Sequence, residues 1–364
     1  MGEQGTGGRI DGTGRRHEEP AARRRGRNAA TWTAIGLLLA GAAALGAAYL
    51  TLDGNIRTVD INTQLGDDRP KNVDDGSLDI LVLGSDSRAG DNSAYGRDDG
   101  GSSRSDTAMV VHLHEGRTAA SVVSIPRDTL ITRPECTDRD GEPVPAAYRA
   151  MFNTAYEVGG PACAVKTVEQ ISGIRMDHYV EVDFTGFRKL IDELGGVEVT
   201  TTQPIRDGSS HLDLPAGTHT LDGEQSLALV RTRKGVGEGS DLGRIQLQHA
   251  FIKALMEQVK QVGVFTSPAR LWGLADAATK AVKPDSGLDS VSELVEFASG
   301  LAELDADQVQ MITLPVVYDT VDRNRVVPVE TQAQQVWSAL RLDQPIPAEA
   351  TKDTATGSAE GVVR

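Results

Sequence analysis

The sequence lacks the short motifs that identify the common hydrolases and nucleotide-binding enzymes. It contains no HExxH zinc-protease motif, no GxSxG nucleophile elbow, no GxxxxGK[ST] phosphate loop and no complete GxGxxG beside a predicted strand. These absences exclude the familiar mechanisms of those enzymes. The chemistry of this chain therefore has to be inferred from the placement of its charged side chains.

Basic side chains are fewer than acidic ones. The chain has 37 Lys and Arg against 52 Asp and Glu, which gives a formal net charge of −15 over 364 residues. Such a chain has no general attraction for polyphosphate strands. Nucleic acid is therefore not expected as a partner.

One long stretch lacks charge altogether. Residues 31–52 contain no charged side chain, and twenty-two residues as a helix cross roughly 30 Å of hydrocarbon. Four arginines lie within residues 23–27, whereas Asp53 and Asp60 follow the stretch, so the positive-inside rule places residues 1–30 in the cytoplasm. A cleaved signal peptide is the rival interpretation, but the apolar stretch is long for a signal core. We expect a single-pass protein of the cytoplasmic membrane whose remaining residues are extracytoplasmic.

Cysteine occurs only twice, at Cys136 and Cys163. Both lie in the part predicted to be exported, where an oxidising environment permits a disulfide, so we predict that they pair. Two buried free thiols are the alternative. With no third cysteine and no CxxC pair, a structural zinc site finds no support in the cysteines.

The exported part divides by composition. Residues 53–77 are polar without a periodic apolar face and are interpreted as a stalk, residues 78–346 as the folded domain, and residues 347–364, which lose the hydrophobic pattern, as a mobile, disordered tail. Short runs rich in Val and Ile predict strands at 78–84, 107–113, 119–125, 179–184 and 309–314, and apolar spacings of three and four predict helices at 184–194, 245–259 and 288–301. Alternating strands and helices indicate a layered α/β domain.

Arginine and aspartate recur at the ends of the predicted strands. The set comprises Asp86 and Arg88 after the first strand, Arg104 and Asp106 before the second, and Arg127 and Asp128 after the third. Loops at strand ends are where α/β sheets bind ligands.

A second group surrounds the glycine-rich segment 235–243. It comprises Arg231, Arg233, Asp241, Arg244 and Gln248. Arg244 and Gln248 are four residues apart, so both project from one face of the helix that follows. Backbone amides at its start are suited to cradling an anion. A flexible loop and a solvated first turn are the plainer interpretation.

These groups predict an anionic ligand. The planar guanidinium of arginine donates in a fork that matches two phosphate oxygens. An anionic ligand would repel Asp86 and Asp106 unless a divalent cation lay between the ligand and these acids. Mg²⁺ prefers hard oxygen ligands of this kind, and Mn²⁺ is the alternative. The rival interpretation is that these acids cap turns and pair with neighbouring arginines. The seven histidines are scattered, with His112 and His114 on one face of a strand, and we interpret them as structural or exposed.

Seven motifs in order resemble those of the LytR-CpsA-Psr family of wall-polymer ligases, and they span residues 78–260. They are LGSDSR (83–88), SRSDT (103–107), SIPRD (124–128), FNTAYEVGG (152–160), DELGGVEV (192–199), LDGEQSLALVRTR (221–233) and SDLGRIQLQ (240–248). The single N-terminal anchor also fits this family.

The resemblance implies an extracytoplasmic phosphotransferase. Such enzymes take a glycopolymer from a polyprenyl diphosphate carrier and join it to peptidoglycan through a phosphodiester. It also implies a three-layer α-β-α sandwich with a mixed central sheet and an apolar pocket for the lipid. Carried over by position, Asp86 and Asp106 would hold Mg²⁺, and the diphosphate would bind to Arg104, Arg127, Arg231, Arg233, Arg244 and Gln248, with Asp241 orienting them. Of these and the strand-end residues, the expected catalytic residues are Arg104, Asp106, Arg127, Arg231 and Arg233. The expected substrate-binding residues are Arg88, Asn153, Asp241, Arg244 and Gln248.

The chain departs from the family pattern at two places. Met151 stands where the family usually has Lys, which removes or replaces one phosphate contact. Leu247 and His249 flank Gln248 where the family often has Arg-Gln-Gln.

Two other functions use the same residues. A non-catalytic envelope regulator would bind polyprenyl phosphate without turnover, although it would gain nothing from acids beside the phosphates. A secreted lipid diphosphatase would use water as the acceptor.

Overall fold

A six-stranded mixed sheet organises the folded part of the chain, in the order β13-β8-β1-β2-β3-β14. The computed structural model describes residues 43–85, 105–138, 140–237, 239–261, 268–302 and 304–364, and it divides the chain into two units, Met1–Thr51 and Leu52–Arg364. The sheet lies in the second unit. Its strands are β1 (Leu78–Ser85), β2 (Ser105–Leu113), β3 (Ala120–Ser124), β8 (His178–Asp183), β13 (Val282–Pro284) and β14 (Val309–Thr313).

The pairing directions explain why distant segments meet. β1 pairs with β2 and β2 with β3 in antiparallel register, whereas β8 runs parallel to β1 and β14 parallel to β3. The beginning of β2 therefore lies at the same edge as the ends of β1, β3, β8 and β14. All five predicted strands are confirmed. The sixth, β13, has three residues and ends in proline, too short a signal for periodicity to detect.

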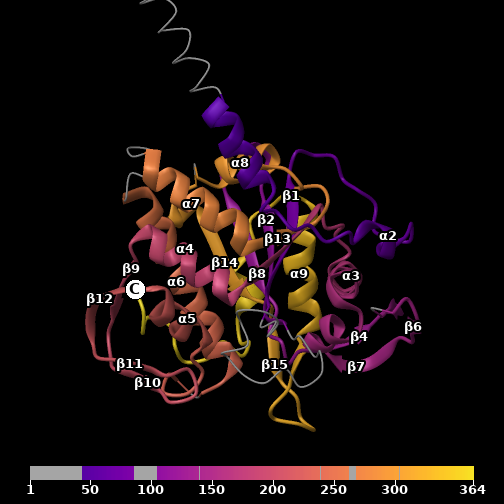
Figure 1. Ribbon diagram of the computed structural model, residues 1–364. Helices are drawn as coiled ribbons and strands as arrows, with labels where there is room; N and C mark the ends of the chain where they lie inside the picture. Colours follow the sequence, from indigo (N-terminus) through magenta and orange to yellow (C-terminus); the bar gives the residue numbers. More distant parts are fainter. Residues whose placement is uncertain (1–42, 86–104, 139, 238, 262–267, 303) are drawn as a thin grey trace, which may run out of the picture. The chain divides into compact units, whose positions relative to one another are not determined.

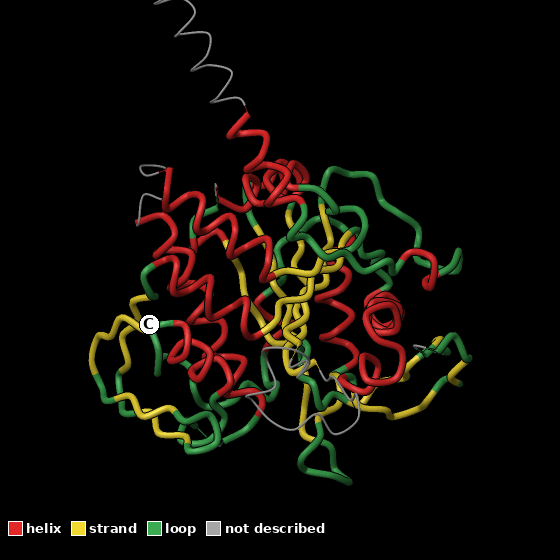
Figure 2. The backbone as a smooth tube through the Cα atoms, in the orientation of Figure 1, coloured by secondary structure: helices red, strands yellow, loops and turns green. Residues whose placement is uncertain are grey.

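Helices cover both faces of the sheet, which gives three layers (Figures 1 and 2). The helices are α2 (Asn62–Leu65), α3 (Asn153–Ser172), α4 (Phe184–Leu194), α5 (Gly223–Arg231), α6 (Asp241–Gln261), α7 (Pro268–Ala281), α8 (Val291–Ala302) and α9 (Glu330–Arg341). The three predicted helices are confirmed as α4, α6 and α8. α4 ends at Gly195, whose φ of +87° is the left-handed cap conformation that glycine adopts without strain.

Small two-stranded sheets and short 3₁₀ helices complete this unit. The strand pairs are β4 (Leu130–Arg133) with β7 (Ala147–Met151), β5 (Cys136–Thr137) with β6 (Pro143–Val144), β9 (Val197–Thr201) with β12 (Gly217–Leu221), β10 (Ile205–Asp207) with β11 (Leu212–Leu214), and β15 (Val316–Tyr318) with β16 (Val326–Pro328). The 3₁₀ helices are η2 (Glu115–Arg117), η4 (Ala306–Gln308) and η5 (Ala348–Thr351).

The two faces of the sheet pack differently. Alternate residues of β1 and β2, such as Leu81 and Val110, join α3 and α9 in a core of mostly fully buried side chains. The opposite residues, such as Ile80 and Met109, face α6 and α8. On that side the partly exposed hydrophobic residues outnumber the fully buried ones, among the residues described. The core is therefore tightly packed on one face and looser on the other.

The prediction of a stalk at 53–77 is wrong. Ile61 and Leu65 are buried in the core beside α3, and Arg69 forms a buried ion pair with Glu169. The segment is polar on average, but two apolar side chains four residues apart suffice to attach it. Asp53 accepts a hydrogen bond from the main chain of Val291, and Asn55 donates one to Asp276, so the whole segment belongs to the folded domain.

The predicted mobile tail is also wrong. Ala359, Val362 and Val363 are buried against α6 and the β9 region. The backbone of Arg364 exchanges hydrogen bonds with Thr200, which continues the ladder of β9. The few apolar residues of the tail are too widely spaced to give a periodic signal, so the sequence pattern missed this strand-like addition.

The predicted disulfide between Cys136 and Cys163 is confirmed and joins β5 to α3. It closes a loop that contains the β5–β6 hairpin and β7.

Within the described part of the chain, no helix combines the length and apolar character needed to cross a membrane. Residues 31–42 of the predicted anchor lie outside the described residues, and the anchor stays a prediction.

The packing of the tail predicts a loss of stability when it is weakened. Val363→Ala removes two buried methyl groups and leaves a small void, so the free energy of unfolding should fall by about 2 kcal/mol. Chemical denaturation measures this change. Glu360→Ala, an exposed neighbour, is the control and should change stability by less than about 0.5 kcal/mol. Equal stability of the two variants would mean that the tail is not packed.

Candidate anion-binding site

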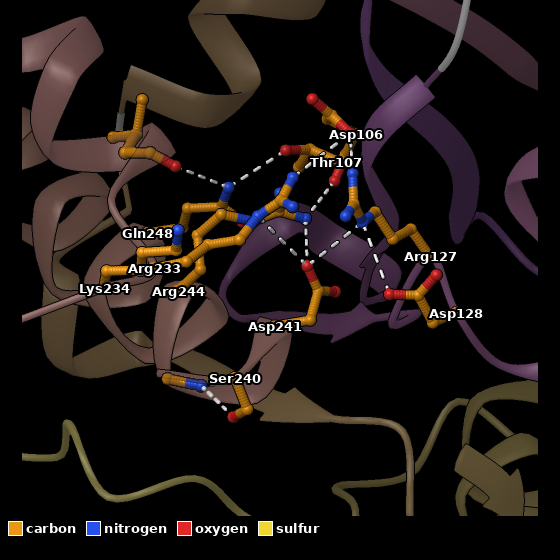
Figure 3. A network of polar contacts seen from close by, with 12 residues as sticks. Asp106, Thr107, Arg127, Asp128, Arg233, Lys234, Ser240, Asp241, Arg244 and Gln248 are labelled. Atoms are coloured by element: carbon orange, nitrogen blue, oxygen red, sulfur yellow. Dashed lines mark hydrogen bonds and ion pairs between the residues drawn. The ribbon is translucent and has the colours of Figure 1, made fainter. Parts of the chain in front are cut away.

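Charged side chains from four separate segments meet at the edge of the sheet where β2 begins (Figure 3). Asp106 lies at the start of β2, Arg127 follows β3, and Arg233 follows α5. Asp241 and Arg244 belong to the first turn of α6. This edge is the one at which the antiparallel pairing brings the strand ends together.

Asp106 is the centre of the cluster. Its Oδ1 accepts hydrogen bonds from Arg127 Nη1 at 2.5 Å and from Arg233 Nη2 at 3.4 Å. Arg244 donates to the main-chain oxygen of the same residue. Three guanidinium groups therefore converge on one strand residue.

Asp241 is a second anionic contact for the same arginines. Its Oδ1 lies 2.7 Å from Arg244 Nη2, 3.5 Å from Arg127 Nε and 3.8 Å from Arg233 Nε. Asp241 thus lies within 3.8 Å of all three guanidinium groups, a position suited to the orienting role expected from the family resemblance.

Local backbone structure fixes Arg233. The carboxylate of Asp207, at the end of β10, accepts hydrogen bonds from the main-chain nitrogens of Arg233 and Lys234. Gly235 follows with a φ of +83°, and a Cβ at this position would lie 2.0 Å from the main-chain oxygen of Arg206. Only glycine fits so close an approach, so the chain turns tightly after Arg233.

Gln248 is held one helical turn beyond Arg244. Its Nε2 donates to Thr107 Oγ1 and to the main-chain oxygen of Val230, both at 3.0 Å. The glutamine thereby ties α6 to β2 and α5, and its other amide atom, Oε1, is buried without a hydrogen-bond partner among the described residues.

The electrostatics of the cluster favour an anion. Burial would raise the pKa of Asp106, but Arg244, Arg127 and Arg233 hold that pKa below its usual value, so the carboxyl is ionised at neutral pH. Burial and repulsion from Arg244 and Arg127 lower the pKa of Arg233 to about 10. Burial would lower the pKa of Arg127, yet Asp106, Asp241 and Asp128 raise it, so both arginines are charged at neutral pH.

Several buried polar atoms of the cluster lack a hydrogen-bond partner among the described residues. They are Arg244 Nε, Gln248 Oε1, Asn153 Oδ1 and Asp241 Oδ2, whereas Arg127 Nε, Arg233 Nε and Asp241 Oδ1 have ion-pair contacts of 2.7–3.8 Å but no hydrogen bond of good geometry. An unsatisfied buried polar atom costs roughly 1–3 kcal/mol, and such atoms are normally few. Their concentration here indicates a site shaped for a polar ligand.

Two clefts open from the cluster. One, of about 460 Å³, lies between Arg127 and the loop that joins β15 to β16, and Arg323 and Arg325 line it. The other, of about 320 Å³, lies on the side of Arg231 and Lys234. Arg233 borders both clefts, so a ligand bound at Arg233 has room on either side.

The remaining predicted residues have varied positions. Arg231 lines the smaller cleft, with its guanidinium 4.8 Å from the centre of the Phe184 ring. Asn153 begins α3 and donates its main-chain N–H to the main-chain oxygen of Arg127, so it lies directly behind that arginine. Asp86, Arg88 and Arg104 lie outside the described residues.

Sequence reasoning missed residues that support the cluster. Asp207 has no feature in the sequence that indicates its role, apart from an Asp-Gly turn. Arg325 is distant from the other site residues in sequence, yet its Nη1 lies 3.4 Å from Asp128 Oδ1 in the larger cleft. Asp128 was noted at a strand end without a role, and it also lies 3.5 Å from Arg127 Nε.

His249 follows Gln248 on α6 and lies half-buried beside the sheet. Its Nε2 lies 2.8 Å from Ser124 Oγ at the end of β3. Burial, with a smaller contribution from Lys253, lowers the pKa of His249 to about 4, so the ring is neutral at physiological pH. His249 also lines a separate cavity of about 790 Å³ between α6, β14 and the C-terminal segment.

Fold and site together define an α/β protein with an arginine-rich anion site at a sheet edge. The chain matches the model of the LytR_cpsA_psr family over residues 48–342. It belongs to this family, as the seven motifs indicated.

Characterised members of the family resemble it at moderate identity. The chain is 32% identical to the cell wall biosynthesis protein LcpA of Corynebacterium glutamicum over 79% of its own length and 60% of that protein. It covers 50% of a second relative from that organism, LcpB, so it spans little more than half of these two relatives. It is 29% identical to the polyisoprenyl-teichoic acid–peptidoglycan teichoic acid transferase TagT of Bacillus subtilis, over 75% of this chain and 82% of TagT.

A solved structure supports the fold. TagT bound to LIIa-WTA superposes with a TM-score of 0.56 at 26% identity, over 78% of this chain and 98% of that one. The expected α/β fold with a mixed central sheet is thereby confirmed.

His249 predicts a pH dependence of stability. Between pH 6.5 and about 4 the unfolded chain binds a proton at this ring and the folded protein does not, so stability rises with pH across this window. On acidification the lowered pKa of this half-buried ring should cost the folded state up to about 3 kcal/mol. Chemical denaturation of the wild type and His249→Gln at several pH values measures this.

The variant should lose this part of the pH dependence, while the exposed control His211→Asn should keep it. If the free energy of unfolding changed equally with pH in the wild type and in His249→Gln, the ring would not titrate as described.

Proposed function

We propose that this protein is a glycopolymer–peptidoglycan phosphotransferase that uses a polyprenyl diphosphate-linked donor. The observation that carries the proposal is the convergence of Arg127, Arg233 and Arg244 on Asp106, with buried polar atoms left for a ligand. A diphosphate offers several oxygens to such forked donors. Family membership and the transferase named among the relatives give the reaction class.

In the proposed reaction, a hydroxyl oxygen of a peptidoglycan sugar attacks the phosphorus nearer to the glycan. The bond between that phosphorus and the bridging oxygen breaks, the lipid leaves as its monophosphate, and the hydroxyl proton is released. The protein supplies position and charge rather than covalent chemistry. Arg127 and Arg233 neutralise charge on the transferred and leaving oxygens.

Asp106 is assigned an electrostatic role. Its lowered pKa makes it a poor proton acceptor near neutral pH, because a general base works best when its pKa is close to the working pH. Both of its side-chain hydrogen bonds fall on Oδ1, so Oδ2 suits a cation. Together with Asp86 it would hold Mg²⁺ or Mn²⁺, which would shield the diphosphate charge.

The looser face of the sheet suits the lipid. Val82, Val111, Ile252, Met256 and Phe297 line the layer between the sheet and α6 and α8, and each keeps part of its surface exposed. An isoprenoid chain would bury this apolar surface. The predicted anchor at residues 31–52 would hold the enzyme in the cytoplasmic membrane, where such carriers reside.

The transfer reaction is tested by removing single guanidinium groups. Arg127→Ala and Arg233→Ala should each lower turnover of a polyprenyl diphosphate-linked glycan by about 10²- to 10³-fold, because each removes a preorganised donor. Arg233→Lys should recover only part of the rate, since lysine keeps the charge but loses the fork. Arg206→Ala is the control, because the Arg206 side chain is 78% exposed and pairs with Asp213 at the surface.

The products separate the competing functions. Polymer on peptidoglycan supports transfer, bound lipid without turnover supports a regulator, and free polymer phosphate supports a diphosphatase. Unchanged rates in both alanine variants, with folding verified by thermal unfolding, would refute the proposed site.

Metal dependence is a separate prediction. Chelation should abolish turnover and added Mg²⁺ should restore it, whereas Asp106→Asn should respond weakly to Mg²⁺ because the hard anionic ligand is lost. Initial rates over a Mg²⁺ series measure the response. Full activity in chelator would contradict a metal at this site.

A further inference from the structure

A second polar cluster lies at the opposite end of β2. His112 and His114 project from the face that carries Val110, because alternate residues of a strand share one face. Asp343, which follows the end of α9, meets them there. The rise of a strand, about 3.3 Å per residue, puts His112 roughly 20 Å from Asp106 along β2.

Three ligand-type atoms face one another in this cluster. Asp343 Oδ1 lies 3.0 Å from His112 Nε2 and 2.7 Å from His114 Nδ1. All three atoms lie within 4.8 Å of one another. Among the described residues, these are the only three side chains that satisfy the geometry of a metal-binding group of His, Cys, Asp and Glu.

The opposite nitrogen of each ring is already held. His112 Nδ1 lies 2.8 Å from Asp79 Oδ1 of β1, and His114 Nε2 lies 3.0 Å from Ser121 Oγ of β3. In metal sites, a ligating histidine almost always uses its other nitrogen for a carboxylate, a carbonyl or water, which fixes the ring. Here two rings from one strand are oriented so that their remaining nitrogens point at the same carboxylate oxygen.

We propose that His112 Nε2, His114 Nδ1 and the Asp343 carboxylate bind a divalent transition-metal ion. Two imidazoles and one carboxylate favour Zn²⁺, with water as the fourth ligand. Ligands of a tetrahedral zinc ion at 2.0–2.1 Å lie roughly 3.4 Å apart, so a small outward shift of Asp343 admits the ion. This site needs no cysteine.

Exposure gives the ion a route to the site. The His112 side chain is 1% exposed, whereas those of His114 and Asp343 are 12% and 22% exposed. The ion would approach from the side of Asp343 and lock the end of α9 onto β2. This role is structural and independent of the anion site, so either proposal can fail without the other.

The test uses the full chain without a tag, in detergent, stripped of metal by a chelator. Zn²⁺ is titrated calorimetrically with excess Mg²⁺ present, because Mg²⁺ occupies oxygen-only sites and competes poorly for imidazole. We expect one Zn²⁺ per chain, a tetrahedral visible spectrum with Co²⁺, and a higher melting temperature with Zn²⁺.

Three variants and a control assign the ligands. His114→Gln and Asp343→Asn should lower Zn²⁺ affinity by at least about 100-fold, and Asp79→Asn by about 10- to 100-fold through loss of ring orientation. The exposed His211→Asn should bind as the wild type does. Melting curves without metal verify that each variant folds.

Two outcomes would overturn the proposal. Failure of the wild type to bind Zn²⁺ would mean that the cluster is only a hydrogen-bonded link between α9 and the sheet. Unchanged affinity in both His114→Gln and Asp343→Asn would place any bound zinc elsewhere.

Discussion

The site depends on keeping three arginines close together in a partly buried place. Burial is the main cause of the lowered pKa of Arg233, and repulsion from Arg244 and Arg127 adds to it. The carboxylates of Asp106 and Asp241 offset part of the repulsion through their ion pairs with Arg233. Asp207 accepts a hydrogen bond from the main chain of Arg233 and so fixes the backbone at this residue. A ligand with several negative oxygens would relieve repulsion among the arginines and accept hydrogen bonds from their buried Nε atoms. Under the proposed function, part of the ligand affinity would therefore come from relieving this repulsion.

The mixed sheet makes this arrangement possible. Because β2 runs antiparallel to both neighbours, its start lies beside the ends of β1 and β3, and α6 delivers Asp241 and Arg244 to the same edge. The other end of β2 lies far from this edge and carries the histidine cluster that α9 reaches through Asp343. One central strand thus links two sites of different chemistry, one rich in guanidinium groups and one in imidazoles.

Sequence patterns predicted the elements and many of the site residues, but not how the chain closes around them. Five strands, three helices and the disulfide followed from periodicity and cysteine count. Charge at strand ends singled out Asp106 and Arg127, whereas only the family resemblance implied that Arg233 shares their site. Asp207 and Arg325 could not be predicted, because their roles arise from contacts between segments far apart in sequence. The stalk and tail were misjudged because a few buried side chains, such as Leu65 and Val363, are enough to attach a segment of polar composition.

Binding of a short isoprenyl diphosphate tests the central claim most directly. Geranyl diphosphate, titrated calorimetrically into the full chain in detergent, should bind the wild type, and Arg127→Ala/Arg233→Ala should lose at least about 100-fold in affinity, since each charge-assisted pair contributes roughly 1.5–3 kcal/mol. Geraniol, which has the same chain without phosphates, should bind both proteins alike. Equal affinity of the wild type and the double variant for the diphosphate would contradict the account.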